Sequence, residues 1–240
     1  MSKDARNIFR RYVVATVGLM FVAMGVALSI IPNLGTAPLS CPAYVLNLRW
    51  PAISVGTFTL IVNTTLILVQ LLLWRRKFRA SYLMQIVASA IFGYMIDASL
   101  WAFSWLHPST FVARLVVCLI AAVITAIGVS IEVEADSWML SAEMTVAAFS
   151  QVFHKRFGPV KVVMDSLMVV VSIVMCAVFF GNPLGAGEWT GLGDFLMAKM
   201  PGIVIGPGTL LLAILPGALM RFSDPWVKRI RDWETGGRKR

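Results

Sequence analysis

The sequence predicts an all-α fold, a polytopic bundle of transmembrane helices, and two observations lead to this fold class. The chain is 58% hydrophobic with only 14% charged residues and a mean hydropathy of +0.80, which excludes disorder and argues against a soluble fold. Most of its 21 Lys and Arg residues gather in four short clusters that separate long apolar stretches. Since a span takes about 20 residues, residues 1–240 have room for about six crossings in a single membrane domain.

The basic clusters also predict the side of the membrane on which each loop lies. They fall at residues 3–11, 75–79, 155–161 and 221–240. Because Lys and Arg in short loops stay on the cytoplasmic side, we expect all four clusters, and with them the N- and C-termini, in the cytoplasm. This placement accounts for the net charge of +9 without nucleic acid as a partner.

Six apolar stretches have the length of a membrane span. Tryptophans near several of their ends fit the interfacial aromatic belt. The first stretch is longer than the apolar run of about 7–15 residues in a signal peptide, so we interpret it as a retained helix. The expected helices cover, with approximate ends, residues 12–31, 55–74, 81–106, 110–131, 160–180 and 202–220.

Two further apolar segments are expected to enter the membrane and return on the same side. Residues 33–54 are interrupted by three prolines, and residues 132–153 carry four acidic side chains. With an even number of crossings between neighbouring basic clusters, the first segment is re-entrant from the outer side and the second from the cytoplasmic side. Two alternatives stay open: each segment could be a full crossing, which puts a basic cluster outside, or residues 132–153 could form an interfacial helix.

The same order of elements occurs twice along the chain. We interpret residues 12–106 as a first repeat and residues 110–221 as a second, each with the order helix, broken segment, helix, helix. Gly25 aligns with Gly128 at an offset of 103. Three crossings per repeat give the two halves opposite orientations. Inverted repeats with paired, interrupted segments point to the midplane site of a secondary transporter. Chance similarity among apolar helices is the alternative.

Polar and acidic residues within the apolar segments supply the candidate site. An ionisable group at the centre of a span costs about 2.5–3.5 kcal/mol on insertion scales, so it faces protein or water and often marks a pathway. Asn63 and Asp165 also occupy matching positions of the two repeats. Packing hydrogen bonds are the structural alternative for each buried group. The candidate solute- and ion-binding residues are Thr36, Ser40, Asn63, Asp97, Glu132, Asp136, Glu143 and Asp165.

The two broken segments predict different chemistry. Thr36 and Ser40 lie beside prolines that suit the start of a short helix, whose N-terminus favours an anion. If residues 132–153 are helical, Glu132, Asp136 and Glu143 share one face. They would then line a water-filled cavity, bind a cation or carry protons, and a solvated acidic face is the alternative.

Metal and enzyme chemistry have little support in the sequence. The three cysteines are isolated, and the chain has no CxxC pair and no Cys/His cluster, so we expect no metal and no other cofactor. Motifs of serine hydrolases, zinc proteases and phosphate-binding loops do not occur. We therefore expect no catalytic residues and no enzyme activity.

An ordered set of motifs carries a resemblance to a known family. In chain order they are LGTAPLSCPAYVLN, SVGTFTLIVNTTLILVQLLLWRRKFR, IFGYMIDASLW and IGVSIEVEADSWML. Together they resemble the YitT/YczE-like family of bacterial integral membrane proteins over about residues 12–221. The resemblance implies a multi-pass protein of the bacterial cytoplasmic (inner) membrane. Activity in that family is largely uncharacterised and transport is often proposed, so the resemblance bears on the fold more than on the activity.

These observations predict a secondary-type transporter of a small anionic or zwitterionic solute, coupled to protons or sodium, with its site between two inverted repeats. Residues 222–240 form a basic tail that we expect to lie as an interfacial helix on anionic lipids of the cytoplasmic leaflet. A homo-oligomer is compatible with the sequence. A non-transporting membrane assembly factor or regulatory subunit is the alternative function.

Overall fold

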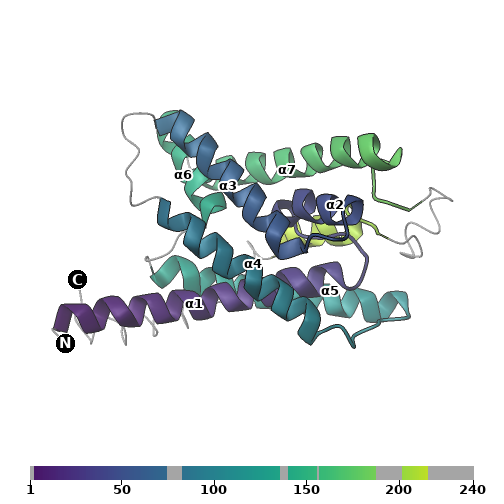
Figure 1. The fold of residues 1–240 in the computed structure, drawn as a ribbon, viewed down its shortest axis with the longest axis horizontal. Helices are drawn as coiled ribbons and strands as arrows, with labels where there is room; N and C mark the ends of the chain where they lie inside the picture. The colour runs from purple at the N-terminus through teal and green to yellow at the C-terminus, as the bar shows by residue number, and fades with distance from the viewer. Residues whose placement is uncertain (1–2, 75–82, 136–139, 156, 188–201, 216–240) are drawn as a thin grey trace.

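Figure 1 shows the computed structural model of the chain, which describes residues 3–74, 83–135, 140–155, 157–187 and 202–215. Within these ranges the regular elements are helices, and one isolated bridge joins Gly185 to Ile203. The elements in chain order are α1 (Lys3–Ile30), the short 3₁₀ helix η1 (Pro38–Ser40), α2 (Cys41–Arg49), α3 (Val55–Trp74), α4 (Met84–Ala102), α5 (Phe111–Ala135), α6 (Ser141–Val152) and α7 (Phe157–Phe180).

Five of the described helices are long and apolar enough to cross a membrane, namely Arg11–Ile30, Val55–Trp74, Met84–Ala102, Phe111–Glu132 and Pro159–Phe180. They confirm the prediction of an all-helical membrane protein. The sixth expected span, about 202–220, is described only up to residue 215, with residues 207–215 helical. Its remainder and the basic tail 222–240 lie outside the described residues.

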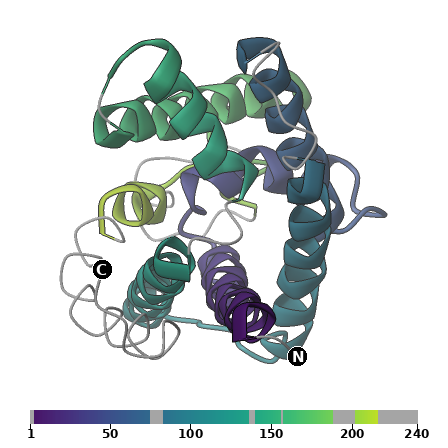
Figure 2. The same cartoon turned by 90° about the vertical axis from the view of Figure 1, so that its left-hand side faces the viewer.

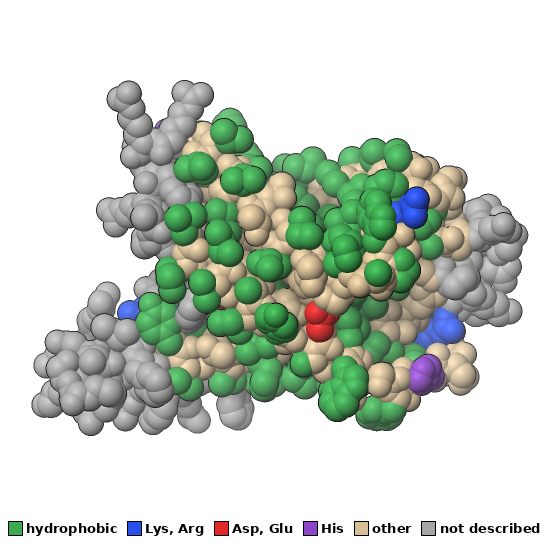
Figure 3. Space-filling view, viewed as in Figure 1, with side chains coloured by type: hydrophobic (Ala, Val, Ile, Leu, Met, Phe, Trp, Pro, Cys, Tyr) green, Lys and Arg blue, Asp and Glu red, His purple; other side chains and the backbone are tan. Residues whose placement is uncertain are grey.

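The outer surface of the bundle is apolar, as a lipid-facing surface must be. On α7, Val162 is 66% exposed and Val178 is 73% exposed. Hydrophobic side chains are spread over the whole described part of the face in Figure 3. Each long helix buries only one stripe, so polar groups on that stripe contact protein rather than lipid.

Close helix crossings depend on glycines, which let backbones approach. A Cβ atom on Gly18 would lie 3.0 Å from the Gly128 carbonyl oxygen, and one on Gly25 would lie 3.1 Å from the Ala121 carbonyl oxygen. Because the contacts run in opposite order along the two helices, α1 and α5 are antiparallel. They lie side by side in Figure 2, on the opposite side of the molecule from α6 and α7.

Both broken segments contain a short helix, and the prolines predicted the one in the first segment. In the first segment the chain forms η1 and α2, and in the second it forms α6. The structure corrects one expectation: residues 132–153 are not a single helix, because α5 continues to Ala135 and α6 begins at Ser141. Glu132 therefore belongs to the preceding long helix, and the predicted acidic helix face does not exist.

Candidate functional site

The two short helices begin in the interior and end at the surface. Cys41 and Ser141, the first residues of α2 and α6, are fully buried, whereas Trp50 and Phe153, which follow their last residues, are exposed. Each helix thus directs its N-terminal end, where free N–H groups and the positive end of the helix dipole lie, into the bundle.

The starts of the two short helices pack against shared apolar clusters. Leu39 in η1 packs against a cluster that contains Ala142 of α6. Tyr44 in α2 packs against a second cluster that contains Leu140, the residue before α6. Two segments that are about 100 residues apart in sequence therefore contribute to the same parts of the apolar interior.

Hydroxyl groups surround the first of these starts. Thr36 is fully buried; its N–H donates to the Val204 carbonyl at 3.0 Å, and its hydroxyl lies 3.1 Å from the hydroxyl of Ser29. The Ser29 hydroxyl donates to the Val26 carbonyl at 2.7 Å, so Thr36 is the donor in the hydroxyl pair. Ser40 is buried at the N-cap of α2 and makes no capping bond with its side chain.

Carboxyl groups surround the second start. Glu132 is 4% exposed, and its Oε1 accepts the Leu140 N–H at 3.3 Å. Glu143 lies in the first turn of α6, where a helix favours negative charge. Its stem is partly exposed, but its Oε2 is buried and has no hydrogen-bond partner among the described residues, and the same holds for the hydroxyl of the fully buried Ser141.

Electrostatic interactions join the carboxyl groups across three helices. Glu132 and Glu143 repel each other, and Lys161 of α7 attracts both. Lys161 also forms an ion pair with Asp165, with 3.8 Å between Nζ and Oδ2. Burial raises the pKa of Glu143, while the charge of Lys161 opposes that rise. The structure thus gathers three of the predicted acids around one lysine.

A buried amide cluster holds the first turn of α6 against α3 and α4. The side-chain amides of Gln70 and Gln85 bond reciprocally, with 3.2 Å between nitrogen and oxygen in each direction. Gln70 Nε2 also lies 2.8 Å from the Ser141 carbonyl oxygen and 3.0 Å from the Thr145 hydroxyl. Neither glutamine was among the site residues predicted from the sequence, although a Gln within an apolar span is itself a signal.

The remaining candidates lie apart from this cluster or outside the described residues. Asp97 accepts the Gly56 N–H at 2.8 Å, so it caps the start of α3. Asn63 is buried on α3, on the same stripe as Gln70. Asp136 is not among the described residues, nor is the side chain of Glu134. Within the described part of the chain, no group of three or more His, Cys, Asp or Glu residues is arranged to hold a metal ion.

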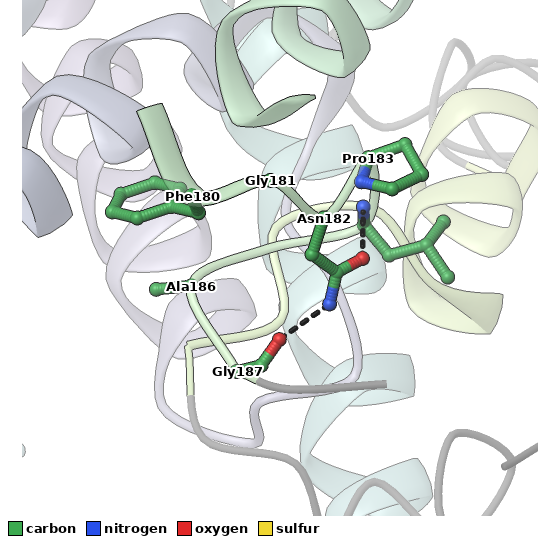
Figure 4. Close-up of a pocket in the computed structure, with 7 residues that line it drawn as sticks. Phe180, Gly181, Asn182, Pro183, Ala186 and Gly187 are labelled. Carbon is green, nitrogen blue, oxygen red and sulfur yellow. Dashed lines mark hydrogen bonds between the residues drawn. The ribbon is translucent and has the colours of Figure 1, made fainter. Parts of the chain in front are cut away.

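A separate hollow of about 570 Å³ lies beyond the end of α7 and is lined by Phe180 and the loop that follows it. Figure 4 shows that the Asn182 side chain is directed into its own loop. There it accepts the Leu184 N–H at 3.0 Å and donates to the Gly187 carbonyl. The hollow is about 30 Å from Lys161 along α7, at 1.5 Å per helical residue. It is therefore remote from the carboxyl cluster.

Comparison with known proteins identifies the family. No curated protein and no solved structure matches the chain. A family described as a family of unknown function, DUF6198, matches residues 9–206, which include every predicted site residue. The resemblance to the YitT/YczE-like family stays a prediction. The chain belongs to the DUF6198 family.

Proposed function

We propose that the protein is a secondary-type transporter of a small anionic or zwitterionic solute, coupled to protons or sodium. One observation carries the proposal: two short helices begin inside the bundle, one start lined by hydroxyls and the other by buried carboxyls. Transporters bind solutes and coupling ions at such interrupted helices near the membrane midplane. The hydroxyl-lined start suits an anionic group, and the carboxyl-lined start suits a cation.

The contacts between α1 and α5 are compatible with an inverted repeat. At an offset of 103, Gly18 corresponds to Ala121 and Gly25 corresponds to Gly128. Exchanging the repeats converts the contact between Gly18 and Gly128 into a contact between Ala121 and Gly25, and both are present. Antiparallel packing of two helices also produces this reciprocity, so the proposed repeat rests on the repeated order of elements along the chain.

The contacts of the short helices also correspond between the two halves of the chain. At the same offset Ser29 corresponds to Glu132, and each side chain bonds to the chain just before a short helix begins: Ser29 to Thr36, and Glu132 to Leu140. The helix α2 packs against α3 of its own half and α7 of the other, and α6 packs against α7 of its own half and α3 of the other. The site would therefore lie where the two halves meet.

The basic clusters set the proposed orientation. With 75–79 and 155–161 in the cytoplasm, α6 returns to the cytoplasmic side and α2 to the outer side. The N- and C-termini are then cytoplasmic, in the inner membrane of a bacterium. The carboxyl-lined start would meet water from the cytoplasm, and the hydroxyl-lined start would meet water from outside.

The first test is thermal stability of the detergent-purified protein against amino acids, carboxylates, sulfonates, vitamins and cations at two pH values. A ligand that binds the folded state raises the melting temperature by mass action. Solutes that give a shift are then tested for uptake into proteoliposomes. We expect Glu143→Gln to reduce uptake by at least about tenfold, because a tenfold change in rate corresponds to only about 1.4 kcal/mol of activation free energy.

A matched variant separates a binding role from a structural one. Asp97→Asn neutralises a carboxyl that caps α3 outside the cluster, and uptake should be largely retained if the variant folds. The proposal would be overturned if no solute raises the melting temperature and a second membrane protein co-purifies in stoichiometric amount. That result would favour an assembly factor or regulatory subunit.

A further inference from the structure

We propose that Glu132 and Glu143 hold a single proton between them, and that this proton is the coupling ion. The coupling role rests on the proposed function. The shared proton itself is a property of the folded protein and can be measured without transport. The inference selects the proton over sodium and assigns it to two named carboxyl groups, with Asp97 and Asp165 excluded.

The geometry leaves one carboxyl oxygen in need of a hydrogen. Glu132 comes from α5 and is held by the Leu140 N–H, whereas Glu143 comes from the first turn of α6. The buried Oε2 of Glu143 has no partner among the described residues. A buried carboxylate oxygen without a donor is unfavourable. A proton placed between the two groups supplies that donor and removes their mutual repulsion.

A second, independent observation lies in the same helical turn. The hydroxyl of Ser141 is fully buried and also lacks a partner in the part of the chain that the structure describes. Its backbone carbonyl, by contrast, is engaged by Gln70. Gln70 thus holds the first turn of α6 through a backbone carbonyl. Two polar side-chain atoms of the same turn have no hydrogen-bond partner among the described residues. This combination is typical of a site that accepts a ligand, here a proton with or without a water molecule.

The charged groups that the structure describes around the pair do not neutralise it. From α7 come Lys161, 39% exposed, and Asp165, 20% exposed, and these two pair with each other. The stripes of α3 and α4 that pack against α6 carry neutral amides and hydroxyls. On α1, Arg11 lies about 10 Å along the helix from Gly18, which contacts α5 beside Glu132. Among the described residues, one lysine shared among three carboxyls leaves a net negative charge that a proton reduces.

A proton fits this site better than sodium does. Hard cations are bound by several oxygen atoms at once, whereas Glu132 already uses Oε1 to accept an N–H. The positive charge of Lys161 acts on both carboxyls and would repel a metal cation. Loading takes one proton from water onto the ionised pair, which changes its charge from −2 to −1, and release returns the same proton to water. No other reactant is required.

The test is infrared difference spectroscopy of the purified protein during a pH titration in sodium-free buffer. A protonated carboxyl has its own carbonyl stretch, which shifts in D₂O. We expect one carboxyl equivalent per protein at neutral pH, lost at alkaline pH. The band should be absent from both Glu132→Gln and Glu143→Gln, because either change removes one of the two carboxyls that share the proton. The matched control Asp97→Asn should retain it.

The outcomes separate this inference from the proposed function. Absence of the wild-type band at every pH above 6, or its persistence in one of the two Gln variants, would overturn the shared proton. If a Gln variant does not fold, Glu143→Asp keeps the carboxyl and should move the band without abolishing it; an unmoved band would count against the assignment. A normal band in a protein that moves no solute would leave the shared proton standing and overturn transport instead.

Discussion

The helices α2 and α6 are both short and both begin in the interior, but their starts differ in how the polar groups are satisfied. At the α2 start the Thr36 N–H and hydroxyl both have partners, Val204 and Ser29. At the α6 start the Ser141 hydroxyl and one Glu143 oxygen have none among the described residues. The comparison teaches that similar helix starts can be stabilised differently: protein partners satisfy Thr36 at the first start, whereas two polar atoms of the second start retain the capacity to bind.

The supports of the two starts also differ. Residues 202–209 hold the first: the Val204 carbonyl accepts from Thr36, and the Gly208 N–H donates to the Leu34 carbonyl at 2.8 Å. Backbone groups make these bonds, so few substitutions would remove them. The second start depends on the side chain of Gln70. A side-chain clamp can be removed by one substitution, which makes the α6 start the more sensitive of the two.

The largest effect is therefore expected from Gln70→Ala. This change leaves the buried Gln85 amide without its reciprocal partner and opens a cavity beside Ser141. Each unsatisfied buried polar group costs about 1–3 kcal/mol, so the total loss of stability should reach about 2–4 kcal/mol with the cavity included. Thermal unfolding in detergent measures it as a marked fall in melting temperature.

The double variant Gln70→Met/Gln85→Met is the control for that prediction. Replacing both members of a hydrogen-bonded pair with apolar groups of similar size is often nearly neutral, so most of the lost stability should return. A double variant no more stable than Gln70→Ala would show that packing, rather than the amide pair, holds the first turn of α6.

An intermediate effect is expected in the pH dependence of stability. Burial raises the pKa of Glu143 above its ordinary value of 4.5. At a pH between 4.5 and the raised pKa, the folded protein therefore binds a proton that the unfolded chain has released. Stability must then fall as pH rises from 4.5 through the raised pKa, and stay level above it. Glu143→Gln should flatten this decline, and Ser40→Ala should keep the wild-type slope. Equal slopes for all three proteins would refute the prediction.

The sequence predicted the breaks in the chain better than the contacts between segments. Prolines mark the first short helix, and Pro38 stands at its N-terminal turn. Between Glu132 and Ser141 the sequence has neither Gly nor Pro, so the end of α5 was placed too early. The pairing of Glu132 with Glu143 was predicted from one helix face, yet it arises between two helices. The predicted helix face was wrong, and the binding role of these residues stays a prediction.

Tertiary contacts explain the remaining differences. Asp97 was selected as an intramembrane acid, but it caps α3 through Gly56, which is 41 residues away in sequence. Gln70 meets Gln85 only because α3 and α4 pack side by side. Such pairings depend on helix register and crossing, and neither is encoded in the apolar periodicity of a single span. Local patterns therefore identified candidate polar groups but could not assign their partners.

The smallest effect is expected from Thr36→Val, which sharpens the contrast with Gln70. Valine keeps the shape and the backbone N–H that donates to Val204, so only the hydroxyl bond to Ser29 is lost. The Ser29 hydroxyl still donates to the Val26 carbonyl, and no buried donor is left unpaired. One neutral hydrogen bond contributes about 1 kcal/mol, so the melting temperature should fall by much less than for Gln70→Ala. A loss as large as that of Gln70→Ala would mean that the α2 start also depends on side-chain hydrogen bonds, and the contrast between the supports of the two starts would fail.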